Sequence, residues 1–241
     1  MKISVIVPAF NEERLIAQTL VQLQQAMTAF SRAGWEAELI VCDNNSTDRT
    51  AELARVAGAR IVFEPINQIA RARNSGAAAA SGDWLVFVDA DSHPTIDLFQ
   101  EVIEQIQGGR CVAGGCTVKL DRDYPVATQV LCLWNWASRS FCLMAGSFIF
   151  CETESFRKIG GFNLELFATE ELDLSKRLKQ LARKTGKTIV ILHRNPLLTS
   201  ARKFHLYTMR EYLWFLARTV ATFGGTLKRR ESCNPWYDGR R

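Results

Sequence analysis

The sequence predicts an α/β fold in which a mostly parallel sheet is covered by helices on both faces. Short apolar runs rich in β-branched and aromatic residues alternate with segments of helical periodicity through the first half of the chain. These runs are apolar throughout rather than alternating with polar residues, as expected of strands buried on both faces. We identify no internal repeat, low-complexity stretch or linker, which indicates one domain.

The first half of the chain alternates strand and helix patterns at the spacing of βαβ units. The cluster Asn45-Ser46-Thr47-Asp48 precedes the second helical segment, and such side chains typically cap helices by accepting hydrogen bonds from backbone amides. Strands are expected at residues 3–7, 38–42, 60–63 and 84–88, and helices at 12–30, 45–57 and 69–80.

Beyond Pro94 the pattern is looser, and its clearest feature is an amphipathic C-terminal helix at 205–223. Apolar residues recur there at three- and four-residue spacing. This stripe is either packing surface, with a homodimer seam as one use, or a face for the membrane interface flanked by basic residues. Helices are also expected at 96–106, around 134–136 and at 172–181, and strands at 111–118 and 188–192.

The composition is that of an ordinary globular protein, with 241 residues of which 47% are hydrophobic and 23% charged. Seven cysteines form no CxxC pair and stand mostly among apolar neighbours, which indicates reduced core thiols rather than a zinc site. We find no signal peptide and no run of about 20 apolar residues, so we expect a cytoplasmic protein.

Positive charge is concentrated in residues 201–241. This stretch holds nine Lys and Arg against three Asp and Glu, whereas the whole chain has a net charge of +5. A basic tail indicates an anionic partner, but no nucleic-acid-binding motif accompanies it. We therefore expect no nucleic acid, but a phosphate-bearing substrate or peripheral contact with the inner face of a membrane.

An acidic pair directly follows the most apolar of the predicted strands. Residues 84–88 end in Asp89-Ala90-Asp91, at the kind of strand end where open α/β sheets bind ligands. Two carboxylates one residue apart offer hard oxygen ligands to a divalent cation, which can in turn hold a diphosphate. The alternative is a polar turn after a buried strand.

Four motifs occur in a fixed order, and the acidic pair completes the third of them. They are Val7-Pro8-Ala9-Phe10-Asn11-Glu12-Glu13, then Cys42-Asp43-Asn44-Asn45-Ser46-Thr47-Asp48, then Ala72-Arg73-Asn74-Ser75-Gly76 before the acidic pair, and finally Gly160-Gly161-Phe162 followed by Glu170-Glu171-Leu172-Asp173. Together they resemble the family 2 glycosyltransferases, whose fold is the GT-A Rossmann-like fold. The resemblance covers roughly residues 1–200, so we assign a GT-A domain to 1–204. Residues 205–241 form the C-terminal helix and tail, as part of that domain or as a membrane or oligomer contact.

The resemblance implies a binding site for a nucleoside diphosphate sugar. The second motif has Asn44 where many members have a second Asp, so the base is open between uracil and guanine, with UDP favoured by family frequency. Guanidinium groups match diphosphate oxygens in a bidentate way. The residues implied to bind the donor are Pro8, Ala9, Phe10 and Glu12 at base and ribose, Asp43 and Asn44 at the base, Arg71 and Arg73 at the diphosphate, Asn74 beside them, and Asp89 and Ala90.

The resemblance also implies a bound Mn²⁺ or Mg²⁺. Asp91 is the expected direct ligand and Asp89 its neighbour at the ribose. A third ligand in many members is a His, and His193 stands at the corresponding place after a strand, with His205 as the competing candidate. Imidazole suits Mn²⁺ better than Mg²⁺.

The last motif implies the catalytic base. Its second acid removes the acceptor's proton in inverting members, which assigns that role to Glu171, with Glu in place of the usual Asp. A carboxylate within hydrogen-bond reach makes a hydroxyl a better nucleophile. Gly146, Glu170, Asp173 and Trp136 are expected on the acceptor side. The alternative is that the acids only favour a helix N-terminus, and that Trp136 packs in the core.

The sequence therefore predicts a metal-dependent inverting glycosyltransferase. It would move a sugar from a nucleoside diphosphate to a hydroxyl acceptor, either soluble or lipid-linked. The alternatives are a retaining transferase of the same fold, a sugar-phosphate nucleotidyltransferase, and a non-catalytic protein that binds a nucleotide sugar. The nucleotidyltransferase is disfavoured because the first motif lacks a Gly-rich loop with a following basic residue.

Overall fold

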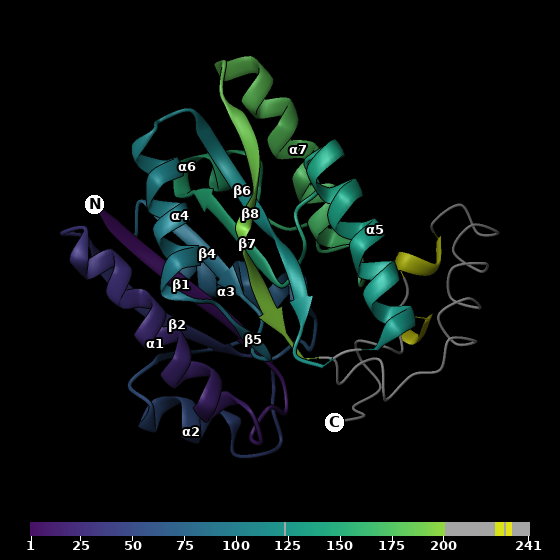
Figure 1. The fold of residues 1–241 in the computed structure, drawn as a ribbon. Helices are drawn as coiled ribbons and strands as arrows, with labels where there is room; N and C mark the ends of the chain where they lie inside the picture. Colours follow the sequence, from purple (N-terminus) through teal and green to yellow (C-terminus); the bar gives the residue numbers. More distant parts are fainter. Residues whose placement is uncertain (123, 201–224, 229, 233–241) are drawn as a thin grey trace.

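The computed structural model describes residues 1–122, 124–200, 225–228 and 230–232, and it has the predicted α/β architecture (Figure 1). Its strands form one sheet in the order β3-β2-β1-β4-β7-β6-β8-β5. The strands are β1 (Lys2–Ala9), β2 (Glu36–Asp43), β3 (Arg60–Phe63), β4 (Trp84–Val88), β5 (Ser92–His93), β6 (Cys111–Leu120), β7 (Phe148–Glu152) and β8 (Thr188–Thr199). The helices are α1 (Ile16–Arg32), α2 (Thr50–Val56), α3 (Ile69–Ala79), α4 (Ile96–Gln107), α5 (Pro125–Phe141), α6 (Thr153–Lys158), α7 (Glu170–Thr185) and the short 3-10 helices η1 (Gly225–Lys228) and η2 (Arg230–Ser232).

The sheet is parallel on one side and mixed on the other. Strands β3, β2, β1 and β4 are parallel, as predicted. Strand β7, which the sequence analysis did not predict, lies between β4 and β6 and is antiparallel to both. It was not predicted because residues 126–150 are mostly apolar, and the spacing of their apolar residues does not change clearly between the helix and the strand.

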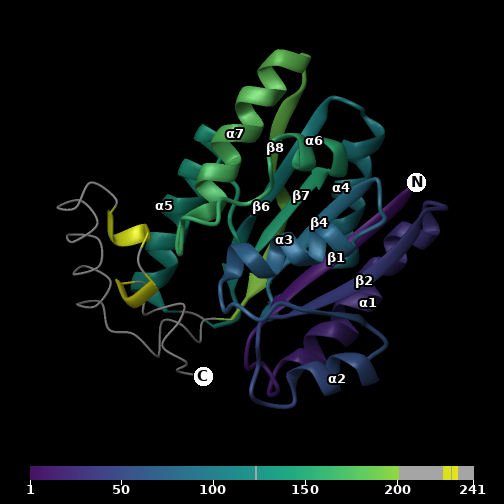
Figure 2. The same cartoon turned by 180° about the vertical axis from the view of Figure 1, so that it is seen from behind.

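Helices cover both faces of this sheet. Figures 1 and 2 show the molecule from opposite sides. Buried residues of α1 and α4 pack on one face, including Leu23, Phe30 and Phe99. The other face buries residues of α3, α6 and α7, including Phe156 and Leu178. Helix α5 lies beside α7 in both views, at the margin of this second layer.

The first two helices begin later than predicted. The first helix begins at Ile16 rather than near Glu12, because the chain turns through Asn11 with a positive φ of 53°. The second begins at Thr50, whose backbone N–H donates to Asp48 Oδ1 at 2.9 Å. Asp48 therefore supports the start of that helix, as the capping cluster predicted.

The predicted helix at 205–223 and the domain boundary at 204 fall outside the described residues, so both stay predictions. The described part of the tail contacts the body: the backbone N–H of Phe167 donates to the carbonyl of Leu227 at 2.8 Å, and Lys228 pairs with Glu165 at 2.9 Å. Within the described ranges, no helix is both long and apolar enough to cross a membrane.

Candidate active site

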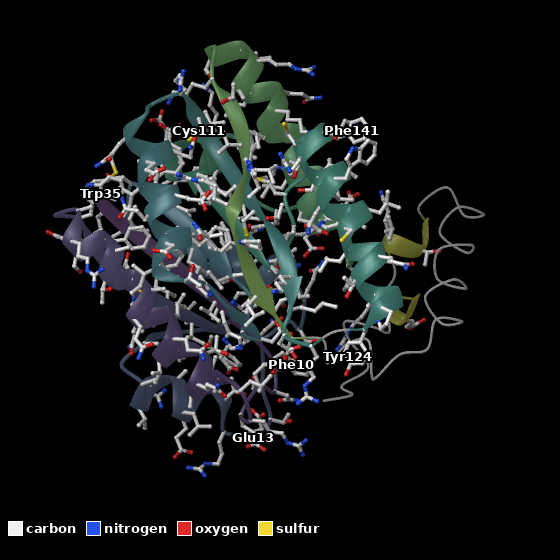
Figure 3. All side chains as sticks on the ribbon, in the orientation of Figure 1. Phe10, Glu13, Trp35, Cys111, Tyr124 and Phe141 are labelled. Carbon is white, nitrogen blue, oxygen red and sulfur yellow. The ribbon has the colours of Figure 1, made fainter. Side chains whose placement is uncertain are left out.

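The loops that follow β1 and β2 are hydrogen-bonded to each other, and we call them the donor edge (residues 8–15 and 43–49). The backbone N–H of Asn11 donates to Ser46 Oγ at 3.0 Å, and that of Thr47 donates back to Asn11 Oδ1 at 2.8 Å. Because β1 and β2 are in parallel register up to Ala9 and Asp43, both loops leave the sheet at one edge. The structure thus brings together the predicted donor residues Pro8, Ala9, Phe10, Glu12 and Asp43, and Figure 3 labels Phe10 at this edge.

The side chain of Asn44 binds the protein backbone, whereas the sequence analysis assigns it to the nucleotide base. It is 3% exposed, and its Nδ2 donates to the carbonyls of Ile66 at 2.7 Å and Glu64 at 3.3 Å. Its Oδ1 accepts from the backbone N–H of Gln68 at 2.8 Å. Since both amide hydrogens are occupied, Asn44 holds the loop at 64–68 against β2 and does not present a donor to a ligand.

Arg73 on α3 is the centre of a buried ion-pair network. Its Nη1 donates to Glu170 Oε1 at 2.7 Å, and its Nη2 donates to Asp89 Oδ1 at 2.9 Å and to the carbonyl of Gly146 at 2.8 Å. The guanidinium carbon lies 5.2 Å from the ring centroid of Phe162. Arg73 is 2% exposed, so these contacts replace its water. One side chain therefore ties the acidic pair after β4 to the acidic motif that opens α7.

This network corrects the predicted role of Arg73. Arg73 is buried and both of its terminal nitrogens donate to protein oxygens, so it joins the two acidic motifs rather than facing a diphosphate. Arg71, two residues earlier, is half-buried and has no hydrogen bond or ion pair within the described part of the chain. Of the two predicted phosphate-binding arginines, only Arg71 is free to bind an anion.

Asp89 and Asp91 lie together where β4 ends. Asp89 keeps 25% of its side-chain surface exposed, and its second oxygen has no partner among the described residues. Asp91 is 6% exposed, and its carbonyl accepts from the backbone N–H of Ser200 at 3.1 Å. Between them Ala90 is buried, and its carbonyl accepts from Thr19 Oγ1 at 2.8 Å. These contacts fix the backbone that carries the two carboxylates.

Glu171 lies beside Arg73 and Gly146. A Cβ added to Gly146 would lie 3.6 Å from Cδ of Glu171 and 3.3 Å from Arg73 Nη2, so the glycine allows the carboxyl to approach. The pKa of Glu171 is raised to about 8, chiefly by burial and also by the charge of Glu170, while Arg73 opposes the rise. Such a perturbed carboxyl in a charged cluster is typical of catalytic sites.

Two other predicted residues have structural partners. The side chain of Asn74 donates to the carbonyl of Phe162 and accepts from its N–H, each at 2.9 Å, which joins α3 to the Gly-Gly-Phe loop. Asp173, expected on the acceptor side, pairs instead with Arg177 one turn further along α7, at 2.7 Å. Arg177 in turn donates to the carbonyl of Ile159 at 2.8 Å. Asn74 and Asp173 thus position backbone around the site.

Gln68 was not predicted as a site residue. It is 2% exposed, and its Nε2 donates to the carbonyls of Leu164 and Leu166, both at 2.9 Å. It therefore links the loop beside the donor edge to the loop that precedes Glu170. No local pattern marks this residue, because its partners lie almost 100 residues away in the sequence.

The structure does not bring His193 to the acidic pair, which argues against its predicted role as a metal ligand. Leu192, next to His193, pairs with Cys116 of β6. Thr199, at the end of β8 that meets β5, pairs with Leu120. The two ends of this segment are therefore four residues apart along β6. At about 3.3 Å per residue this is roughly 13 Å. His193 instead lines a pocket with Trp136, and Trp136 is 61% exposed rather than in the core. His205 lies outside the described residues.

No cluster of three or more His, Cys, Asp or Glu side chains suited to a metal is found in the part of the chain that the structure describes. Two carboxylates nevertheless fit one kind of metal site. Mg²⁺ usually keeps several waters and binds one or two carboxylates together with substrate phosphates, rather than a complete protein cage. The donor set of Asp89 and Asp91 suits a divalent cation that arrives with a diphosphate.

Comparisons with known sequences place the chain among sugar transferases. The family model for "Glycosyl transferase family 2" matches residues 4–153. The chain is 30% identical over 123 residues to the dolichol-phosphate mannosyltransferase of Pyrococcus furiosus, covering 48% of this chain and 33% of that protein. It is 33% identical over 138 residues to a glycosyltransferase of Mycobacterium tuberculosis, covering 57% and 54%. The chain thus spans a third to about half the length of these relatives.

Solved structures show the same fold. A mannosyltransferase from Pyrobaculum calidifontis, in complex with GDP-Man and Mn²⁺, matches with a TM-score of 0.66 and 19% identity, over 98% of this chain and 67% of that one. Glucosyl-3-phosphoglycerate synthase from Mycobacterium tuberculosis, in complex with Mn²⁺, UDP and glucosyl-3-phosphoglycerate, matches with a TM-score of 0.59 and 21% identity, over 91% and 77%. These likenesses confirm the predicted GT-A fold.

Proposed function

Because the chain belongs to glycosyl transferase family 2, we propose that it transfers a sugar from a nucleoside diphosphate to a hydroxyl acceptor, with inversion at the sugar's C1. The observation that carries this proposal is the Arg73 network. It holds the acidic pair at the end of β4 and the acidic motif of α7 on either side of one guanidinium. A donor-binding group and a base are thereby fixed relative to each other, as a displacement reaction requires.

The donor's diphosphate is assigned to the space at Asp89, Asp91 and Arg71. A bound Mn²⁺ or Mg²⁺ would neutralise charge that builds on the leaving diphosphate. Asp91 and Asp89 would hold this cation, because they are the carboxylates fixed where β4 ends. Arg71 would bind the phosphate oxygens, because its guanidinium is uncommitted while that of Arg73 is not. The base and ribose are assigned to the donor edge, with UDP favoured over GDP.

Glu171 is proposed as the general base. The acceptor's hydroxyl oxygen attacks C1 of the sugar, the bond from C1 to the phosphate oxygen breaks, and the hydroxyl proton passes to the Glu171 carboxylate. A base opposite the leaving diphosphate enforces a single displacement and therefore inversion. Its raised pKa means that the carboxyl is mostly protonated at pH 7, so the transfer rate rises with pH toward about 8.

The acceptor side is proposed to lie along Gly146, Glu170 and the segment that leads back into α5. A lipid-linked acceptor and a peripheral membrane contact would give the basic residues of 201–241 an anionic partner. The relative from Pyrococcus furiosus is named a dolichol-phosphate mannosyltransferase, which supports this assignment. A soluble acceptor is the alternative, and a retaining reaction of the same fold would leave Glu171 without a role as base.

The deciding experiment is calorimetric titration of UDP and of GDP, each with Mn²⁺ and then with EDTA, into the wild type, Asp91→Ala and Glu171→Gln. We expect one nucleotide to bind in a Mn²⁺-dependent way to the wild type and to Glu171→Gln, but not to Asp91→Ala. With the matching donor sugar, Glu171→Gln should turn over about 10²- to 10⁴-fold more slowly than the wild type. Absence of nucleotide binding would overturn the donor site, and near-normal turnover by Glu171→Gln would overturn the base assignment.

A further inference from the structure

A cavity lies between α5 and the strands β6 and β8, and none of its described lining residues belongs to the Arg73 network. Its volume is about 640 Å³, which is enough for a small sugar derivative. We call it the α5 pocket. Among the described residues, its lining combines hydroxyl, thiol, amide, aromatic and basic side chains, without a carboxylate. The residues that carry the argument are Thr117, Asn135, Trp136, Arg139, Ser140 and His193.

An irregularity in the sheet forms one wall of the pocket. The pairing of β6 with β8 passes from Cys116–Leu192 directly to Val118–Leu197, so residues 193–196 of β8 bulge out opposite Thr117. Bulges of this kind often re-aim side chains beside functional sites. The bulge is anchored on its far side by Glu101 of α4, which accepts from the backbone N–H of Asn195 at 2.8 Å and from its Nδ2 at 2.6 Å.

The opposite wall is fixed just as firmly. On α5, Asn135 accepts from the backbone N–H of Val118 at 3.0 Å and donates to its carbonyl at 2.9 Å, which clamps the helix to β6. The ring of Trp136 meets the ring of Phe141 edge-on, with centroids 6.2 Å apart, and Figure 3 labels Phe141 at the end of α5. The cavity is therefore held open by contacts on both sides rather than by loose packing.

One buried group in this pocket lacks a partner. Thr117 is 6% exposed, and its Oγ1 has no hydrogen-bond partner among the described residues. A buried hydroxyl without a partner is destabilising, so such groups call for an explanation. A ligand hydroxyl or an anionic oxygen inside the pocket would satisfy it.

The charged lining residues favour an anion. Arg139 is exposed and has no ion pair within the described part of the chain, and His193 is exposed beside it in the lining. Since no acidic side chain is found among the described residues that line the pocket, a ligand with a phosphate would meet no carboxylate from them. The face of Trp136 offers the apolar surface on which a sugar ring stacks.

We propose that the α5 pocket binds a phosphorylated sugar. Arg139 and His193 bind the phosphate, Thr117 and Ser140 bond to sugar hydroxyls or to a phosphate oxygen, and Trp136 stacks against the ring. This site is separate from the donor edge and from the Arg73 network. Its occupation requires no assumption about the reaction that takes place at Glu171.

The test is calorimetric titration of the full chain with glucose 6-phosphate, and separately with glucose and with inorganic phosphate. Glucose 6-phosphate should bind more tightly than either fragment. Thr117→Val, which keeps the shape but removes the hydroxyl, and Arg139→Gln should each weaken binding about tenfold, the loss expected for one good hydrogen bond or charged contact.

Matched variants make the result specific. Thr117→Ser keeps the hydroxyl, and Arg183→Gln removes an exposed arginine of α7 outside the pocket, so both should bind as the wild type does. Binding of UDP or GDP with Mn²⁺ should be unchanged in all four variants. The proposal is overturned if glucose 6-phosphate does not bind, if Thr117→Val and Arg139→Gln bind it as tightly as the wild type, or if saturating nucleotide displaces it.

Discussion

The donor edge and the α5 pocket use polar residues in opposite ways. At the donor edge Asn11 and Asn44 bond to neighbouring loops, so the polar side chains define a rigid rim. In the α5 pocket a buried hydroxyl at Thr117 and an unpaired guanidinium at Arg139 have no such partners within the described residues. The difference separates residues that shape a site from residues that are available to a ligand. Arg73 and Arg71 repeat the same contrast within two residues of one helix.

The largest effect on stability is expected when Arg73 is replaced. Replacing Arg73 by Met leaves the buried Glu170 and the partly buried Asp89 without their common cation, so we expect a loss of about 3–5 kcal/mol in the free energy of unfolding. Urea denaturation followed by circular dichroism measures it. Arg71→Met is the matched control and should change stability by less than about 0.5 kcal/mol. Equal losses from both variants would refute the division of roles between the two arginines.

The pH dependence of stability tests the same network at Glu171. Its pKa of about 8 lies above the usual glutamate value of 4.5, so between these values the folded state binds more protons than the unfolded state. The contribution of Glu171 to the free energy of unfolding therefore falls as pH rises from 4.5 through 8. Glu171→Gln removes this dependence, and its melting temperature should exceed that of the wild type at pH 9 but approach it at pH 5. A constant difference across this range would show that Glu171 does not titrate as proposed.

At the donor edge, Asn44→Ala should cost about 1–3 kcal/mol in the free energy of unfolding, because three hydrogen bonds to residues 64–68 are lost and the backbone N–H of Gln68 stays buried without its acceptor. Thermal unfolding of the variant provides the value. Gln100→Ala, which removes an exposed amide from α4, should lie within about 0.5 kcal/mol of the wild type. If Asn44→Ala changed stability as little as Gln100→Ala does, the Asn44 side chain would not be what holds the rim.

The smallest change in stability is expected in the α5 pocket, where the substitution should stabilise the protein rather than destabilise it. Thr117→Val removes a hydroxyl that has no partner among the described residues, so the ligand-free protein should become more stable, by up to about 1 kcal/mol. Differential scanning calorimetry without sugar phosphate measures the shift. A loss of stability would mean that the hydroxyl already has a partner in the free protein, and the contrast with Asn44 would disappear.

What the sequence predicts well is local. The strand that ends at Val88 and the acidic pair after it are adjacent in the chain, and both lie where the apolar pattern placed them. The role of Arg73 depends on Asp89 and on Glu170, which is 97 residues away, so no spacing rule reveals it. His193 was misplaced for a similar reason, because its position depends on a bulge that only the register of β6 and β8 defines.

Strand β7 has a consequence for how the chain folds as it is synthesised. It covers the edge of β4 by pairing Trp84 with Glu152 and Val88 with Phe148, although the two strands are far apart in the sequence. While the ribosome is still making residues 89–147, β4 is an apolar strand with an open edge, which is a template for association with other chains. Nascent chains stalled before residue 148 should therefore depend on chaperones, whereas chains that extend past residue 152 can close the sheet.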